Sequence, residues 1–117
     1  MYEFKRLEQQ DLNKLNSLKL LTLTWECCES TFKILSNETI VGLIEITCNL
    51  PNLENTSFIF NFEVVDKGKG IGTDIIKNII YTSYSNFRLI PLNIQSKNFW
   101  EKLGFKSDGE EMVYSQN

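Results

Sequence analysis

The chain has 117 residues, of which 42% are hydrophobic and 23% are charged, a composition typical of one soluble globular domain spanning residues 1–117. Its 12 basic and 15 acidic side chains give a net charge of −3 and form no basic stripe, which argues against nucleic acid as a partner. No stretch approaches the roughly 20 apolar residues of a membrane span, and the N-terminus lacks the apolar run of a signal peptide, so we expect a cytoplasmic protein with no membrane partner.

The first predicted elements are a strand and a helix. Residues 2–7 alternate in hydrophobicity, which favours a strand, while Leu12, Leu15 and Leu18 recur at three-residue steps, which favours a helix over residues 8–21. The next segment, TLTWECCES at residues 22–30, is ambiguous, and we interpret it as a short helix.

The middle of the chain is predicted to be β-structure. The runs TFKIL and TIVGLIEITC flank the short polar turn SNE, a pattern typical of an antiparallel hairpin over residues 31–48. Pro51 and several Asn mark a loop over residues 49–56. The run SFIFNFEVV at residues 57–65 is the strongest strand signal, and it places Phe58, Phe60 and Phe62 on one face.

A helix and a strand follow. Ile75, Ile76, Ile79 and Ile80 mark one face of a helix that continues to about residue 84. Residues 87–94 read as a strand, in which Pro91 indicates a sheet edge or a splayed pair because proline cannot donate to a ladder.

The last predicted elements are a short helix and a strand. Residues 96–105 read as a helix with Ser96 as its N-cap and Gly104 as the left-handed residue at its C-terminal end. Residues 112–115 read as the final strand. The order of elements predicts the α/β class, with helices packed against a mixed sheet.

The cysteines give no sign of a metal site or of disulfides. The sequence has no histidine, and its three cysteines, Cys27, Cys28 and Cys48, lack C-x-x-C spacing. An odd number of cysteines, two of them adjacent in the sequence, is typical of reduced thiols. We therefore expect no metal and assign the cysteines no catalytic role.

Gly68, Gly70 and Gly72 occupy alternate positions between the Phe-rich strand and the Ile-rich helix, in a segment we call the glycine loop (residues 67–72). A strand that turns through glycines into a helix directs free N–H groups and the positive end of the helix dipole at one spot, which predicts an anion site, usually for phosphate. Lys67 and Lys69 would add positive charge at its rim. The Walker and dinucleotide spacings are absent, and a tight structural turn is the alternative interpretation.

Two motifs together resemble the GNAT superfamily of acyl-CoA N-acyltransferases. The glycine loop, KGKGIG, resembles the family's phosphate loop R/Q-x-x-G-x-G/A, with Lys67 in its first position. The segment NIQSKNFWEKLGF at residues 93–105 resembles the family pattern N-x-x-A/S-x-x-F-Y-x-K-x-G-F, with Trp100 in place of Tyr. The resemblance covers nearly the whole chain, although residues 12–30 are shorter than the usual two-helix region. It implies a mixed, mostly antiparallel sheet flanked by helices, with splayed fourth and fifth strands.

The resemblance also implies that acetyl-CoA, or a related acyl-CoA, binds where those strands splay. The pyrophosphate would contact backbone N–H groups of residues 68–73, and the pantetheine arm would pair with the backbone of the fourth strand. The residues expected to bind the cofactor are Phe62, Val64, Lys67, Gly68, Lys69, Gly70, Ile71, Gly72, Thr73, Asn93, Phe99 and Trp100.

The implied reaction is direct attack of a primary amine, from a small molecule or a protein, on the thioester, with a backbone N–H of the fourth strand stabilising the oxyanion. Many relatives use the Tyr of the second motif to protonate the leaving thiolate, but the indole of Trp100 is a very poor acid. Tyr114 is another candidate proton donor. Glu63 and Glu45 are the candidate bases, and for each the alternative is a solvated surface carboxylate.

Other functions fit the same motifs. The main alternative to an N-acetyltransferase is a non-catalytic CoA-binding regulatory module of the same fold. The short region at residues 12–30 would leave an open substrate side, which favours a bulky acceptor such as a protein, including in a toxin component. If the resemblance is set aside, the remaining alternative is a generic phosphate-binding domain. A homodimer is a further expectation, because dimers are common in this superfamily.

Overall fold

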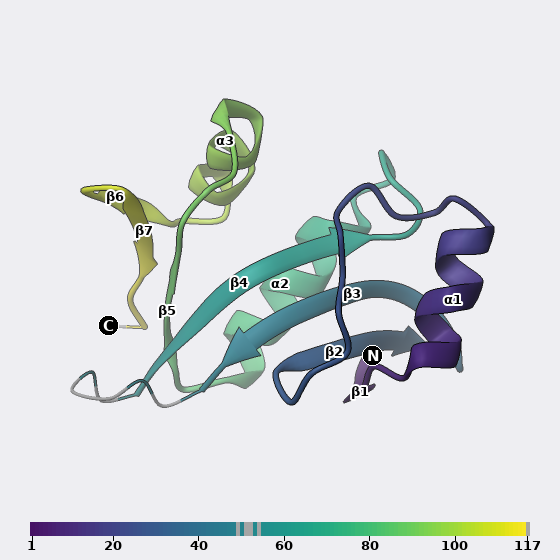
Figure 1. The fold of residues 1–117 in the computed structure, drawn as a ribbon. Coiled ribbons are helices and arrows are strands. Elements are labelled where there is room, and N and C mark those ends of the chain that lie inside the picture. Colours follow the sequence, from purple (N-terminus) through teal and green to yellow (C-terminus); the bar gives the residue numbers. More distant parts are fainter. Residues whose placement is uncertain (49, 51–52, 54, 117) are drawn as a thin grey trace. The chain divides into compact units, whose positions relative to one another are not determined.

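The computed structural model describes residues 1–48, 50, 53 and 55–116 (Figure 1). Within these residues the strands are β1 (Glu3–Arg6), β2 (Thr31–Ser36), β3 (Thr39–Thr47), β4 (Thr56–Val64), β5 (Asn86–Leu89), β6 (Lys106–Asp108) and β7 (Glu111–Tyr114). The helices are α1 (Gln9–Ser17), α2 (Ile71–Thr82) and α3 (Ile94–Lys102). None of the helices in the described part of the chain has the length and apolar character needed to cross a bilayer.

The strands form one mixed sheet in the order β1-β2-β3-β4-β5-β7-β6. The β4–β5 pair is parallel, whereas the pairs β1–β2, β2–β3, β5–β7 and β6–β7 are antiparallel. The predicted α/β class, with a mostly antiparallel sheet and helices, is therefore confirmed.

Contacts divide the chain into two compact units. The first contains Met1–Ile46 and Asn61–Gly72, and the second contains Thr47–Phe60 and Thr73–Asn117. That the chain is one domain over residues 1–117 stays a prediction.

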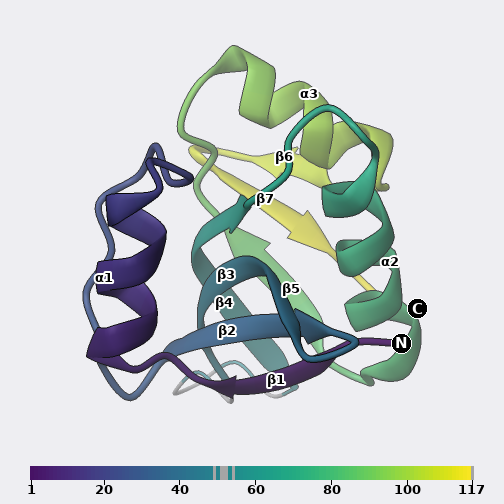
Figure 2. The same ribbon diagram turned by 90° about the vertical axis from the view of Figure 1, so that its right-hand side faces the viewer.

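The first unit is built on the β2–β3 hairpin, with β1 beside β2 (Figure 2). Asn37 and Glu38 form the turn and both have positive φ, 51° and 66°. Two consecutive left-handed residues are what a type I′ turn requires, and this turn matches the twist of the two strands. The predicted hairpin is confirmed.

The core of the first unit contains two of the three leucines that predicted α1, whereas the third, Leu18, follows the helix and is 56% exposed. Leu12 and Leu15 are buried together with Leu7, Trp25 and Leu43. The backbone N–H of Glu8 donates to the Asp11 carboxylate at 3.0 Å and so satisfies one donor at the start of α1. The helix ends at Ser17, earlier than the predicted end near residue 21.

The short helix predicted over residues 22–30 is wrong, because that segment contains no helical residue. Thr22, Leu23 and Trp25 instead donate hydrogen bonds to the distant carboxylate of Glu63. Thr and Trp are weak helix formers, so long-range hydrogen bonds decide the conformation of this segment.

In the second unit, β4 and β5 diverge where the prediction placed a splay. Their pairing runs from Thr56 and Asn86 to Ile59 and Leu89. Beyond that point β4 continues to Val64, whereas β5 ends two residues before Pro91. The strand predicted over residues 87–94 is therefore too long, and the splayed pair is confirmed.

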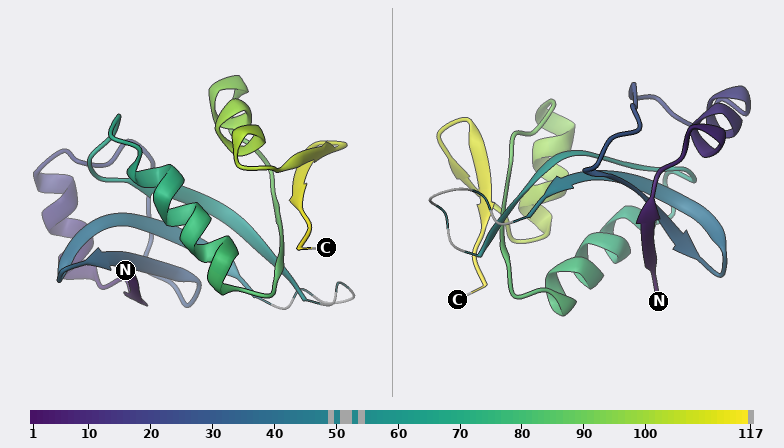
Figure 3. Two further views of the ribbon diagram at one scale, coloured as in Figure 1. Left: turned by 180° about the vertical axis from the view of Figure 1, so that it is seen from behind. Right: turned by 60° about the horizontal axis from the view of Figure 1, so that its bottom comes forward.

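The core of the second unit contains two of the four isoleucines predicted to face inward from α2, whereas Ile79 and Ile80 are half-buried. Ile75 and Ile76 are fully buried, as are Phe87, Leu89 and Met112. Figure 3 shows α3 after β5, followed by the β6–β7 hairpin that completes the unit.

The helix predicted over residues 96–105 is present, but α3 begins and ends earlier, at Ile94 and Lys102. Its N-cap is Asn93, whose side chain accepts a hydrogen bond from the backbone N–H of Ser96 at 2.8 Å, so the prediction of Ser96 as the N-cap is wrong. Gly104 follows the C-cap with a φ of 100°, as predicted for a left-handed terminating residue.

The prediction also missed β6, a three-residue strand of exposed polar residues that pairs with β7. Of the loop predicted over residues 49–56, residues 49, 51, 52 and 54 lie outside the described part of the chain.

Candidate cofactor site

The glycine loop connects the end of β4 to the start of α2, the strand–turn–helix context that its sequence predicted. Gly68 and Gly70 have φ values of 83° and 76°, a conformation that costs other residues about 1–2 kcal/mol. A Cβ placed on either residue would meet nothing within 4 Å. The protein's own packing therefore does not require these glycines. The backbone conformation does, and it leaves the loop backbone open to a ligand.

The remaining predicted loop residues lie in the first turn of α2, a helix of 12 residues. Ile71, Gly72 and Thr73 are its first three residues, and all are half-buried. The first N–H groups of a helix have no partner within the helix, and the helix dipole places partial positive charge there. The chemistry of this end of α2 therefore suits an anion.

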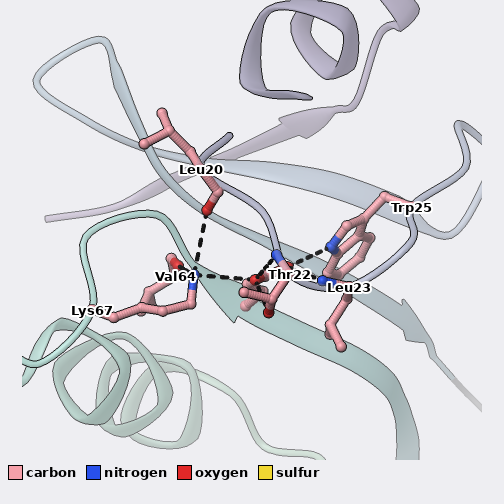
Figure 4. Close-up of polar contacts among 7 residues, drawn as sticks. Leu20, Thr22, Leu23, Trp25, Val64 and Lys67 are labelled. Atoms are coloured by element: carbon pink, nitrogen blue, oxygen red, sulfur yellow. Dashed lines mark hydrogen bonds and ion pairs between the residues drawn. The ribbon is translucent and has the colours of Figure 1, made fainter. Parts of the chain in front are cut away.

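The two lysines of the glycine loop have different surroundings. The Lys67 ammonium lies 2.8 Å from the Val64 carbonyl oxygen, 3.3 Å from that of Leu20 and 3.1 Å from Glu63 Oε2. The Lys69 ammonium pairs at 3.0 Å with Asp66, and both of those side chains are largely exposed. Lys69 is thus an exposed residue of the glycine loop, whereas the Lys67 side chain is bound to protein groups (Figure 4).

Glu63, near the end of β4, accepts hydrogen bonds from Thr22, Leu23 and Trp25 and pairs with Lys67. We call these five residues the Glu63 cluster, and Figure 4 labels the four partners of Glu63. Its Oε2 accepts from both the backbone N–H and the hydroxyl of Thr22, each at 2.6 Å. Its Oε1 accepts from the Leu23 N–H at 3.1 Å and from the Trp25 indole at 2.9 Å. The residue is only 5% exposed.

These contacts set the acidity of Glu63. Burial by itself would raise the pKa of the carboxyl group. Hydrogen bonds from the Thr22 hydroxyl, the Trp25 indole and the two backbone N–H groups outweigh burial and lower the pKa to about 2. A carboxylate that is this acidic and accepts four hydrogen bonds is a weak proton acceptor, which argues against its expected role as a general base.

Glu45, the other candidate base, is half-buried on β3 in the same unit. Its Oε1 accepts a hydrogen bond from the Asn61 amide at 2.9 Å. Phe62 and Val64, expected to contact the cofactor through their backbone, are half-buried on β4. The first unit therefore brings together the glycine loop, the end of β4 and both candidate carboxylates.

The phenylalanines of β4 do not form its most buried side. Phe58 and Phe60 pack together with ring centroids 4.8 Å apart, yet Phe60 is 47% exposed. Ile59, on the opposite face of the strand, is buried. The prediction that Phe58, Phe60 and Phe62 share one face of β4 agrees with this pattern, and that face leaves the Phe60 side chain at the surface.

The second unit holds the other predicted site residues, Asn93, Phe99 and Trp100. Trp100 is buried, with ring centroids 5.0 Å from Phe99 and 5.1 Å from Phe105. Asn93 is exposed and caps α3. Capping of α3 therefore accounts for Asn93, which the second motif shares with the family, and packing accounts for Trp100, which replaces the family's Tyr.

The cysteines Cys27, Cys28 and Cys48 are free thiols on the surface. Across the described residues, no group of three or more His, Cys, Asp or Glu side chains is arranged to hold a metal ion.

Comparison with known proteins gives matches at the level of structure only. No family model matches the sequence, and no curated protein matches it. Among similar solved structures is a chimera of the spermidine N-acetyltransferase SpeG from Vibrio cholerae and hSSAT, 17% identical, with a TM-score of 0.66 and coverage of 98% of this chain and 96% of that one.

Two further matches are with proteins solved with CoA or an analogue. The Bacillus subtilis N-acetyltransferase YlbP in complex with coenzyme A is 16% identical, with a TM-score of 0.58 and coverage of 98% and 97%. Naa50 from Arabidopsis thaliana, in complex with the bisubstrate analogue CoA-Ac-MVNAL, is 16% identical, with a TM-score of 0.55 and coverage of 96% and 95%.

The fold is that of the GNAT N-acetyltransferases. This fold was expected from the glycine loop and the segment at residues 93–105, and the structural matches confirm it. At identities of 16–17% the three likenesses carry the fold alone.

Sequence reasoning missed the Glu63 cluster, although one signal was present. Glu63 is the lone charge in the apolar run FNFEVV, and a charge in a buried strand needs partners. Which residues would supply them could not be read from the sequence, because Thr22 and Trp25 are about forty positions away from Glu63.

The low pKa of Glu63 makes a testable contribution to acid stability. The group is more acidic in the folded chain (about 2) than its ordinary value of 4.5, so its stabilisation is present above about pH 4.5 and is lost as the pH falls through 2. We expect wild type to be more stable than Glu63→Gln near pH 7, and the gap to shrink as the pH falls from 4.5 towards 2. Urea unfolding of both proteins across this range measures the difference, and a gap that does not change with pH would contradict the assignment.

Proposed function

We propose that the chain is an N-acetyltransferase that transfers the acetyl group of acetyl-CoA to a primary amine. The observation that carries the proposal is the glycine loop, open and left-handed at Gly68 and Gly70, between β4 and the N-terminus of α2 in a GNAT fold. The complexes of YlbP with coenzyme A and of Naa50 with a CoA analogue support CoA as the ligand.

In the proposed complex the backbone of the glycine loop and the first turn of α2 bind the pyrophosphate. Residues 68–73 supply N–H groups, and the helix dipole favours the negative charge. Phe62 and Val64 offer backbone groups of β4 to the pantetheine arm, by the hydrogen bonding that adds a strand to a sheet. The expected roles of Asn93, Phe99 and Trp100 stay predictions of the family resemblance.

The proposed chemistry is direct transfer, and it needs little acid catalysis. The amine nitrogen attacks the thioester carbon, the carbon–sulfur bond breaks, and CoA leaves as the thiolate. A thiol has a pKa of about 8.5, so its thiolate leaves without full protonation near neutral pH. The missing Tyr acid at Trp100 is therefore compatible with activity. Of the candidate bases, Glu45 suits removal of a proton from the ammonium through water better than Glu63, whose two oxygens already accept four hydrogen bonds.

The experiment that tests the function is CoA-thiol release from acetyl-CoA with a panel of amines. The panel contains spermidine and a peptide with a free N-terminus, because the similar structures include a spermidine N-acetyltransferase and an enzyme bound to a CoA–peptide analogue. We expect thiol release that depends on the amine. Tight binding of acetyl-CoA with no release for any amine, including protein extracts, would instead support the regulatory module.

A matched pair of glycine variants tests the cofactor site. Gly70 and Gly109 both have positive φ, 76° and 65°, and a Cβ meets nothing within 4 Å at either position. Gly70→Glu and Gly109→Glu therefore impose similar backbone strain and the same added charge, but only the first adds bulk and negative charge at the proposed pyrophosphate site. By calorimetric titration we expect Gly70→Glu to weaken CoA binding by more than about a hundredfold, about 2.7 kcal/mol, and Gly109→Glu to bind like wild type. Equal affinities for the two variants would contradict the loop assignment.

A further inference from the structure

We propose that Glu63 is a positioning residue for the glycine loop and acts through Lys67. The proposal rests on the proposed function, since it takes the glycine loop to be the pyrophosphate site. It gives Glu63 a role in binding the cofactor and removes it from the proton-transfer step.

The contacts of Lys67 are the first step of the argument. Lys67 begins the loop motif, yet its ammonium turns back onto the end of β4 and contacts three oxygens, those of Val64, Leu20 and Glu63. An ammonium has three donors, so these contacts use its full hydrogen-bonding capacity. The Lys67 side chain therefore ties the start of the loop to two other backbone segments instead of projecting from it.

The second step is that the Glu63 carboxylate, which binds the Lys67 ammonium, is itself held rigidly. The Glu63 carboxylate is held by hydrogen bonds from Thr22, Leu23 and Trp25, and its side chain is 3% exposed. A charged group with every lone-pair direction occupied has little freedom to move with a partner. The ion pair with Glu63 therefore fixes the position of Lys67, the residue that precedes Gly68.

The third step concerns the cost of ordering the loop. Glycine has the largest backbone freedom of any residue, so a loop with three glycines in five residues loses much entropy when it binds a ligand. An ion pair that already fixes the first residue lowers this cost, which is how pre-organisation strengthens binding. The Glu63–Lys67 pair should thus tighten binding of ligands that contact the loop.

Lys106 offers a matched control. It lies on the exposed strand β6, outside the glycine loop and the Glu63 cluster. Lys106→Met removes the same charge as Lys67→Met and leaves both of these features unchanged.

The test measures affinity for CoA and for pantetheine, which lacks the phosphates. We expect Lys67→Met and Glu63→Gln each to weaken CoA binding about tenfold, because a charge-assisted contact is lost, with pantetheine affinity unchanged. The double variant should lose no more than either single variant, since both changes break one pair. Lys106→Met should stay within about threefold of wild type.

The results separate the competing roles. If Lys67 instead served the phosphate directly, Glu63→Gln would free it and CoA binding would tighten. If Glu63 were the base, Glu63→Gln would lower kcat and leave CoA affinity intact. Either result overturns the proposal, as does wild-type affinity in Lys67→Met, a half-exposed position whose variant should fold even if Glu63→Gln does not. Wild-type protein that binds CoA no better than ATP would overturn the proposed function, and this proposal with it.

Discussion

The buried carboxylate of Glu63 is the interaction on which much of the first unit depends. An ionised group in the interior costs several kcal/mol unless hydrogen bonds or an opposite charge replace the water it has lost. Glu63 meets this requirement with four hydrogen bonds and the ammonium of Lys67. The donors come from the segment after α1, which has to stay irregular for its free N–H groups to point at β4. One charge therefore fixes the course of that segment and the start of the glycine loop together.

The same interaction explains how the proposed anion site can follow directly after a negative charge. Glu63 and Lys67 offset each other, so neither contributes much net field at the loop. What remains for a phosphate is the first turn of α2, the open backbone at Gly68 and Gly70, and the exposed Lys69. Recognition of this kind depends on the conformation of the main chain. It tolerates Lys67 in the first motif position, because the side chain there has a structural task.

Sequence predicted the features that rest on local chemistry. The leucines of α1, the isoleucines of α2, the β2–β3 turn and the glycines each carry a pattern that physical rules connect to one conformation. The predictions that failed concern residues whose hydrogen-bond partners are distant in the sequence, or positions for which two residues compete. The segment at residues 22–30 lacks a helix because its donors bind Glu63, and Asn93 caps α3 in place of Ser96, since either residue type suits an N-cap. The exposed strand β6 has no apolar residue, so it gave no alternation to detect.

The measurement that tests the central claim most directly is an NMR titration of 15N-labelled protein with CoA and, separately, with pantetheine. If backbone N–H groups of the glycine loop bind the pyrophosphate, the amide signals of residues 68–73 shift saturably with CoA and hardly move with pantetheine. The amides of the β6–β7 hairpin, which also has a glycine with positive φ, serve as the internal reference. Saturable shifts that leave residues 68–73 unmoved, or that pantetheine reproduces in full, would contradict the account.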